Sequence, residues 1–276
     1  MQDNYANLSI GQKQIATEIL ENKENYMYYS ISSMSKELAI SMASLSRFVK
    51  KLGYKNYAEF KKELSNEMLM NLDPNIKMQS NLNKLDENNE SIESQIIKDI
   101  DTMSKFIQKI DYEEINKAIT EIAKAKNIVL MGLGMSKSLV YFLDFRLKRM
   151  GIKTKIMISG GAEFIEDLTT IRKDDLIITV SFKREYKELL LALNYANKFN
   201  IRTISITEDL KGRVAKNADI ILEVKRGSYE DLNSLALPVS FCNALLLKVA
   251  HLQKEEIYSH MDVLSDINKE YFESEE

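Results

Sequence analysis

Hydrophobic positions along this chain follow two different periods, and the change of period divides the chain into two parts. Over residues 8–69, and again from 92 to 125, apolar side chains recur every three or four residues, as on one face of an α-helix. Between residues 127 and 224, five short runs dense in Ile and Val alternate with helix-period segments. Apolar strands that alternate with helices are typical of a parallel sheet covered on both faces.

The pattern predicts individual elements of this α/β part. The expected strands are Asn127–Met131, Lys155–Ser159, Leu176–Val180, Ile201–Ile206 and Ile220–Val224, with helices at 137–150, 162–171, 187–199, about 211–217 and 239–252. Residues 71–91 contain Pro74 and six Asn and have little apolar period, which favours a linker. We therefore expect a helical domain at 1–72, a linker at 73–91 and an α/β domain at 92–276. No element is predicted for the acidic tail.

Composition limits the possible functions. The chain has 276 residues, 45% of them apolar and 29% charged, with a net charge of −3, so any DNA-binding surface must be local. One Cys and two His exclude a disulfide framework and a Cys/His zinc cluster within one chain. The start has no signal-peptide pattern, and the longest uncharged stretch, 232–247, is too short to span a bilayer. We expect a cytoplasmic protein that needs no metal, cofactor or membrane, with Cys242 in its core.

The segment Ser41–Leu52 predicts an amphipathic helix in a locally basic region. Leu45, Phe48, Val49 and Leu52 form one apolar stripe, and Ser41 is a suitable N-cap. A second short helix, Ser33–Ala39, precedes it through a tight turn, as in a helix-turn-helix. Between residues 33 and 62, seven Lys and Arg stand against two Glu. The alternative is an ordinary solvated helix face.

If this helix binds DNA, its small first residues let the N-terminus approach base edges, and its cations can meet a guanine or phosphates. The candidate DNA-binding residues are Ser41, Ala43, Ser44, Ser46, Arg47, Lys50 and Lys51, with Lys55 and Lys61 on phosphates.

Residues 5–70 resemble the N-terminal domain of the RpiR (or MurR/RpiR) family of bacterial transcription regulators. The resemblance is carried by Ser41, Ser44, Arg47-Phe48, Lys51-Leu52-Gly53-Tyr54 and Phe60-Lys61. In that family the Ser-to-Phe stretch is the recognition helix, and Leu-Gly-aromatic ends it, so Gly53 is expected to cap the helix in the left-handed conformation. One departure is Ala39-Ile40, where the family usually has Gly and a hydrophobic residue.

A glycine loop follows the first predicted strand. Gly132-Leu-Gly-Met-Ser136 lies between a strand and a helix, a position that suits an anion. A dinucleotide fingerprint would need Gly at Lys137, and Ser136-Lys137-Ser138 imitates only the end of a P-loop. A third candidate is the sugar isomerase (SIS) domain, whose first loop is similar to GxGxS before a helix that ends in Gly, here Gly151. The fourth is a tight turn that binds nothing.

The chain from about Ile110 to Gln253 resembles a SIS domain, which implies a flavodoxin-like, doubly wound sheet and a sugar-phosphate ligand. Where the second SIS loop reads Ser-x-Ser-Gly-x-Thr, this chain keeps Ser181 but has Lys183, Arg184 and Tyr186. The two cations could hold an anion by charge, or could instead face solvent or a partner subunit. The candidate ligand-binding residues are Gly134, Ser136, Ser181, Lys183, Arg184 and Tyr186.

The third SIS loop keeps Ala218-Asp219 but has Gly212 in place of Ser. Glu208 and Asp209 in this loop would repel a phosphate unless they bind sugar hydroxyls.

SIS domains also serve ketol-isomerases, which need a general base. His251 lies in an apolar helix, His260 in the tail, and Glu163 and Glu166 at a helix start, so we expect no enzyme.

Together the resemblances imply a DNA-binding regulator of sugar or amino-sugar metabolism genes, with a double-stranded operator and a sugar-phosphate effector. It would be a homodimer or tetramer through its SIS domains, with helices 92–110 and 234–252 as candidate interface elements. The rival hypotheses are a SIS-domain sugar-phosphate isomerase and a DNA-binding dimer whose SIS half only dimerises.

Overall fold

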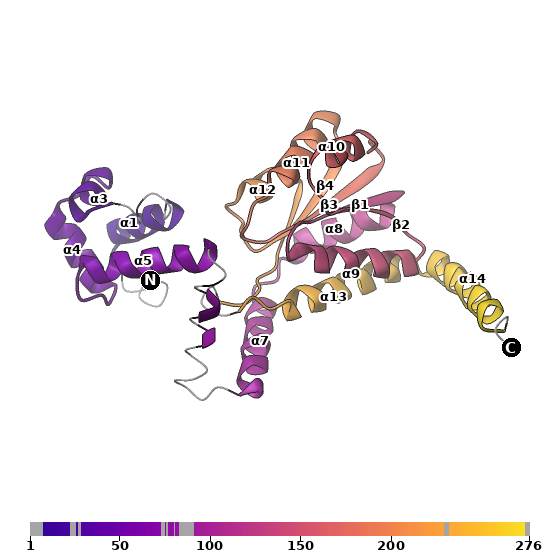
Figure 1. Ribbon diagram of the computed structural model, residues 1–276, viewed down its shortest axis with the longest axis horizontal. Coiled ribbons are helices and arrows are strands. Elements are labelled where there is room, and N and C mark those ends of the chain that lie inside the picture. The colour runs from indigo at the N-terminus through magenta and orange to yellow at the C-terminus, as the bar shows by residue number, and fades with distance from the viewer. Residues whose placement is uncertain are drawn as a thin grey trace. The chain divides into compact units, whose positions relative to one another are not determined.

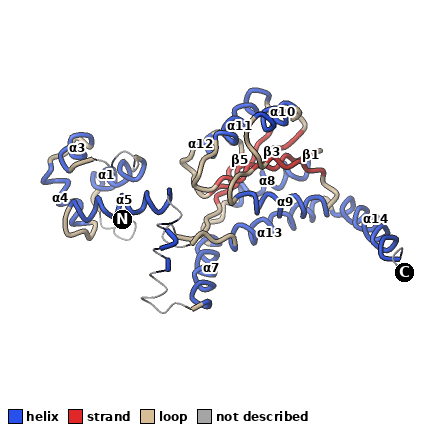
Figure 2. Tube along the Cα trace, in the orientation of Figure 1, coloured by secondary structure: helices blue, strands red, loops and turns tan. Residues whose placement is uncertain are grey.

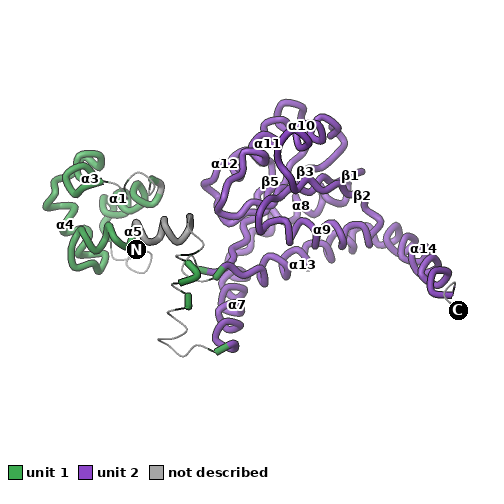
Figure 3. Tube along the Cα trace, in the orientation of Figure 1, with its two compact units in different colours: residues 1–91, 228–232 green, residues 92–227, 233–276 purple. Residues whose placement is uncertain are grey.

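The computed structural model describes residues 8–22, 26, 29–72, 75, 77–79, 81–82, 91–228 and 232–273, without the side chains of 21 and 65–72. The chain forms two compact units (Figure 3). Unit 1 comprises Met1–Ser91 with Ser228–Leu232, and unit 2 comprises Ile92–Gly227 with Asn233–Glu276. Most of the segment expected to be a linker lies outside the described residues, and those described at 75, 77–79 and 81–82 are helical.

Unit 1 is helical, as the spacing of its apolar residues by three or four positions predicts. Its described helices are α1 (Ile10–Glu21), α3 (Ile31–Glu37), α4 (Met42–Lys51) and α5 (Tyr57–Leu72), labelled in Figure 1. Their apolar faces meet in one core, which includes Ile19 of α1, Met34 of α3, Phe48 of α4 and Phe60 of α5, each at most 1% exposed.

The helices α3 and α4 end in the same backbone motif, although their sequences differ. Past the end of α4, Gly53 has φ 97°, and the amides of Gly53 and Tyr54 donate back to Lys50 and Val49. This is a Schellman cap, and it confirms the expected role of Gly53. Past the end of α3, Ala39 takes the glycine's place with φ 52°, and Ile40 donates to Ser35 at 2.9 Å. Ala39 therefore makes the same cap after α3 that Gly53 makes after α4, but it puts an L-residue in the left-handed region.

Unit 2 is built on a parallel five-stranded sheet in the order β2-β1-β3-β4-β5, which is the flavodoxin-like order. The strands are β1 (Asn127–Met131), β2 (Lys153–Met157), β3 (Asp175–Ser181), β4 (Arg202–Thr207) and β5 (Ile220–Glu223). The predicted fold class is confirmed. The position predicted for β2 is wrong by two residues, because the cap at Gly151 ends the preceding helix early enough for Lys153 to pair with Asn127.

Helices cover both faces of this sheet, as Figure 2 shows. One face packs against α8 (Tyr112–Lys124), α9 (Ser136–Arg149) and α13 (Ala236–Leu252), and the other against α10 (Ala162–Thr169), α11 (Lys187–Phe199) and α12 (Arg213–Lys216). The helix expected over about 211–217 is thus a single turn. An outer helix, α7 (Ile92–Ile107), joins α13 through an edge-to-face contact of Phe106 and Phe241 at 5.6 Å. Cys242 is fully buried, as expected.

The tail contains a helix that the sequence did not predict. α14 (Lys254–Glu273) follows α13 after a bend of 102°. Among the described residues, no single helix has both the length and the apolar composition of a membrane span; α13 and α14 meet those two criteria only when they are taken together.

The left-handed conformation of Ala39 gives a stability prediction. Ala39→Gly should raise the opening free energy of unit 1 by about 0.5–1 kcal/mol, because glycine enters this region without the Cβ clash that alanine suffers. Amide hydrogen exchange of α4 peptides in the full chain measures that free energy. Ala58→Gly, at an exposed position of α5 without a positive φ, is the control and should not increase protection. If the α4 amides exchange equally slowly in wild type and in Ala39→Gly, the backbone of Ala39 is not strained.

Candidate functional sites

The first candidate site is the outer face of α4. Ser41 precedes the helix, and its hydroxyl accepts the Ser44 amide at 3.1 Å, which confirms the predicted N-cap. Leu45, Phe48 and Val49 are at most 1% exposed, so the predicted apolar stripe is the buried face. The opposite face is therefore turned to solvent by packing.

The structure leaves six of the nine predicted DNA-binding residues exposed, on α4 or in the segments next to it. Ser41, Ala43, Arg47, Lys50, Lys51 and Lys55 are exposed, whereas Ser44, Ser46 and Lys61 are half-buried. Arg47 Nη2 lies 3.4 Å from Ser44 Oγ, near the start of the helix. Lys51 Nζ donates to Gln12 Oε1 of α1 at 2.9 Å, so this lysine also ties α4 to its neighbour.

The second candidate site lies where β1 and β3 end, at the carboxyl edge of the sheet. Gly132 is packed tightly, since a Cβ there would lie 2.8 Å from Val140 Cγ2. Gly134 has φ 59°, and a Cβ on it would lie 2.3 Å from the Tyr186 hydroxyl. Tyr186 therefore covers Gly134, and two loops that are about 50 residues apart in sequence meet there.

The start of α9 is less open to an anion than its sequence suggests. Ser136 is 5% exposed, and the amides of Ser136, Lys137 and Ser138 donate to the carbonyls of Leu133, Gly134 and Met135 at 3.1–3.2 Å. These three amides are thus engaged within the turn. The dipole of the helix remains, but side chains must supply most of the contacts to a ligand.

Ser181 at the end of β3 is such a side chain. It is 2% exposed, and its hydroxyl has no hydrogen-bond partner among the described residues. Ser205 and Gln253 also have such an atom, but Ser181 is the one at the carboxyl edge of the sheet, where a bound ligand would supply the partner that its hydroxyl lacks.

The two cations of the second loop lie at its surface. Lys183 and Arg184 are exposed, and the Arg184 guanidinium lies 5.4 Å from the centre of the Tyr186 ring. The backbone amide of Lys183 donates to Glu208 Oε1 at 3.2 Å, which fixes the loop against the end of β4.

A buried ion pair, which the sequence did not predict, holds these loops together. Arg226 Nη2 and Glu208 Oε1 are 2.6 Å apart, and both side chains are 7% exposed. Arg226 Nε and its backbone amide also donate to Glu208 Oε2, at 3.3 and 3.2 Å. The same guanidinium lies 4.2 Å from the centre of the Phe182 ring and 3.3 Å from Met135 Sδ. The Arg226 guanidinium, which follows β5, thus contacts one residue after each of β1, β3 and β4.

This pair corrects the expectation for Glu208. Its two carboxylate oxygens accept four hydrogen bonds from protein groups, so it is neutralised in place and has no need of sugar hydroxyls. Asp209 accepts the Lys211 amide and thereby shapes the turn that follows β4. A signal for Arg226 was present in the sequence: a cation just after a buried parallel strand lies at the edge where the other loops converge.

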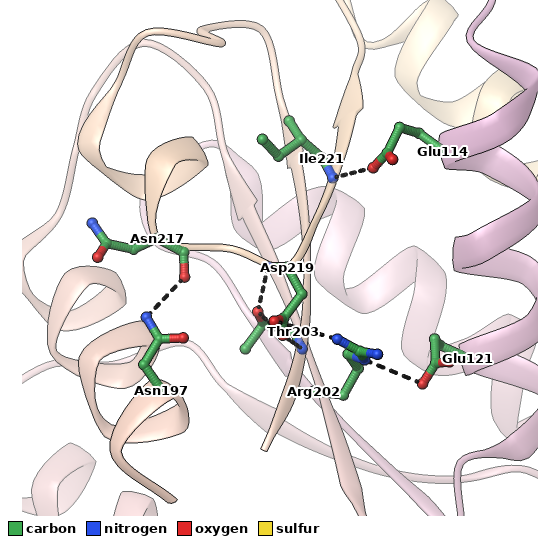
Figure 4. A network of polar contacts seen from close by, with 8 residues as sticks. All are labelled: Glu114, Glu121, Asn197, Arg202, Thr203, Asn217, Asp219 and Ile221. Atoms are coloured by element: carbon green, nitrogen blue, oxygen red, sulfur yellow. Dashed lines mark hydrogen bonds and ion pairs between the residues drawn. The ribbon is translucent and has the colours of Figure 1, made fainter. Parts of the chain in front are cut away.

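The Ala218-Asp219 pair that the SIS resemblance singles out has a structural role. Asp219 Oδ2 accepts the amide and the hydroxyl of Thr203, both at 2.8 Å, and Arg202 bridges Asp219 and Glu121 at 3.4 and 3.6 Å (Figure 4). This network fastens β5 to β4 and to α8.

The residues considered for catalysis are scattered. His251, Glu163 and Glu166 are exposed on α13 and α10, and His260 of α14 packs on Gly151, next to the amino end of β2. Within the described ranges, no group of three or more His, Cys, Asp or Glu is placed to hold a metal ion.

Comparisons with known proteins agree with both halves of the molecule. The model of the rpiR-family helix-turn-helix domain matches residues 1–71, and that of the SIS domain matches residues 121–248. The chain belongs to the RpiR family. This places it among transcriptional regulators that join a helix-turn-helix domain to a SIS domain.

The individual proteins to which the chain is similar are distant in sequence. A Providencia stuartii protein named as an uncharacterized HTH-type transcriptional regulator is 25% identical over 76% of this chain and 74% of its own length. The sugar isomerase domain of an RpiR transcription factor from Sphaerobacter thermophilus has a TM-score of 0.60 and 25% identity, covering 64% of this chain and 99% of that one. Vibrio vulnificus NanR, solved with ManNAc-6P, has a TM-score of 0.56 and 20% identity, covering 96% and 95%.

The buried ion pair gives the prediction for this part of the molecule. Glu208→Ala should lower the free energy of unfolding of unit 2 by about 3–5 kcal/mol, because it leaves the Arg226 charge buried and unpaired. Urea denaturation followed by circular dichroism measures the change. Asp174→Ala breaks the exposed Lys126–Asp174 pair and should cost about 1 kcal/mol or less. A similar small loss for both variants would show that Arg226 finds other partners.

Proposed function

We propose that this chain is a DNA-binding transcriptional regulator whose operator affinity is changed by a sugar phosphate bound in the SIS domain. The observation that carries the DNA-binding part is the capped helix α4, which buries Leu45, Phe48 and Val49 and turns Ala43, Arg47 and Lys50 outward. Small residues at the N-terminus and cations behind them are what a recognition helix needs in a major groove.

The effector site that we propose is made by Gly134, Ser136, Ser181, Lys183, Arg184 and Tyr186. The Ser181 hydroxyl supports it, since it is buried without a hydrogen-bond partner in the described part of the chain and precedes two exposed cations in the same loop. Glu208 does not oppose an anion there, because Arg226 neutralises it. NanR, which has the same fold, was solved with ManNAc-6P, which makes a phosphorylated sugar or amino sugar the class to test first.

The mechanism follows from linkage. An effector that binds one arrangement of a dimer more tightly shifts the dimer toward it, by an amount set by the difference in affinity. Two recognition helices must lie about 34 Å apart to read successive major grooves, so we propose a homodimer, or a tetramer of two dimers, on a near-palindromic operator. The proposed domains are 1–72 for DNA and 92–276 for the effector, joined by 73–91, in a cytoplasmic protein without enzymatic activity that controls sugar or amino-sugar genes.

Arg47→Ala should weaken specific operator binding by about 1–3 kcal/mol, or roughly 5- to 150-fold, the scale of one lost base contact. Fluorescence anisotropy with a duplex from the promoter beside the protein's own gene measures it. Arg172→Ala, which removes an exposed cation from unit 2, is the control and should bind as wild type. If Arg47→Ala also binds as wild type, α4 is not the recognition helix.

The double variant Lys183→Ala, Arg184→Ala should lose the effector response while it keeps its operator affinity, because it removes the charge that meets the anion. Lys187→Ala, an exposed lysine at the start of α11 just beyond the loop, is the matched control. Titration of the protein–operator complex with sugar phosphates measures the response. A full response in the double variant would mean that these cations point elsewhere.

The experiment that tests the whole proposal is the same anisotropy titration at two salt concentrations against scrambled competitor, repeated across a panel of sugar phosphates. Specific binding that one sugar phosphate changes is the expected result. Specific binding that no sugar phosphate changes would favour a SIS half that only dimerises. Turnover of a ketose or aldose phosphate that Arg47→Ala leaves intact would favour the isomerase.

A further inference from the structure

The helix α14 has an apolar face that the described part of its own chain covers only in part. None of its 20 residues is buried, and Figure 1 shows it extending beyond the ends of α9 and α13. Its first two turns adjoin the end of α9, where His260 packs on Gly151. One face gathers large apolar side chains: Ile257, Met261, Leu264, Ile267, Tyr271 and Phe272.

A helix of this kind needs a partner surface. Helices in proteins owe most of their stability to the packing of an amphipathic face, and a single helix of this length is marginal in water. The other face of α14 is strongly acidic. Six carboxylates stand against two lysines: Glu255, Glu256, Asp262, Asp266, Glu270 and Glu273 against Lys254 and Lys269.

A surface with the complementary character lies on α9. Tyr141 and Phe145, one helical turn apart, are 50% and 60% exposed, although the opposite side of the same helix is core. Cations flank the two rings, with Lys137 and Lys148 on one side and Arg146 and Arg149 on the other, against the single carboxylate of Asp144. Arg149 lies 6.0 Å from the centre of the Phe145 ring. An apolar helix with acidic edges therefore matches this aromatic strip in shape and in charge.

The chain cannot make this match with itself as it is folded, because α14 leaves the body at the end of α9 and runs beyond it. We propose that α14 of one chain packs along α9 of a second copy of this chain, and that the second copy returns the same contact. A reciprocal exchange closes under twofold symmetry and covers both exposed strips at once. At about 1.5 Å per residue, α14 is about 30 Å long and α9 about 21 Å, so one helix can cover the other.

If α14 packs on α9 of the partner, two variants that each dimerise poorly alone should dimerise better when they are mixed. Contacts of α14 with α14, or of α9 with α9, predict no such gain. Tyr141→Gln with Phe145→Gln removes the α9 strip, and Met261→Gln with Leu264→Gln removes the centre of the α14 strip; glutamine keeps the helices. By sedimentation equilibrium of the full chain, each double variant should dimerise at least about tenfold more weakly than wild type. In an equimolar mixture, one of the two exchanges is intact, so the mixture should form more dimer than either variant alone at the same total concentration.

The control is Ser259→Gln, an exposed residue on the acidic side of α14, which should dimerise as wild type. Unchanged circular dichroism and melting temperature in every variant show that folding is retained. Wild-type dimerisation in both double variants would overturn the proposal, and so would a mixture that dimerises no better than its parts, which would indicate α14-on-α14 or α9-on-α9 contacts. The inference rests on the homodimer of the proposed function and specifies its interface. Because the measurement uses neither DNA nor effector, its failure would leave operator binding and the effector response to be judged by their own tests.

Discussion

The geometry of the carboxyl edge of the sheet depends on the buried ion pair of Glu208 and Arg226. Parallel strands deliver their following loops to one edge, but the sheet's hydrogen bonds stop where the strands end. Beyond that point, one guanidinium contacts Met135 and Phe182, and one carboxylate accepts the amides of Lys183 and Arg226. The attraction of a buried ion pair offsets the cost of desolvating its two charges only when the geometry is good and the other polar atoms are hydrogen-bonded, so the pair tolerates little movement of the loops it joins.

That constraint also decides the charge that the proposed effector site presents. Without Arg226, Glu208 would place a negative charge beside the second loop and would oppose a phosphate. With Arg226 the two charges cancel, and the exposed cations of the second loop set the local sign. Tyr186 adds a steric limit, because its hydroxyl already lies over Gly134. A ligand that reaches the glycine loop must share that space or displace the ring.

The sequence predicted what local patterns determine. The N-cap Ser41, the buried stripe of α4, the cap at Gly53, strand β1 and helix α11 follow from propensity and period, and the structure confirms them. It did not predict features that arise from contacts between distant segments. Arg226 and Glu208 lie 18 residues apart, and Tyr186 meets Gly134 across 52 residues. The sequence analysis also did not predict the helix α14, because its apolar positions were taken as part of the tail and no surface on which they could pack was evident.

The burial of Cys242 has a practical consequence. It is the only cysteine in the chain, it is fully buried in α13, and desolvation raises the pKa of its thiol to about 12. Because the thiolate is the reactive form, we expect this buried thiol to react only slowly with maleimides at neutral pH. A cysteine introduced at the surface can therefore carry a spin label or dye selectively in the otherwise native sequence. The protein is thus suited to pulsed electron resonance or single-molecule fluorescence, which would measure the distance between the two α4 helices of the proposed dimer.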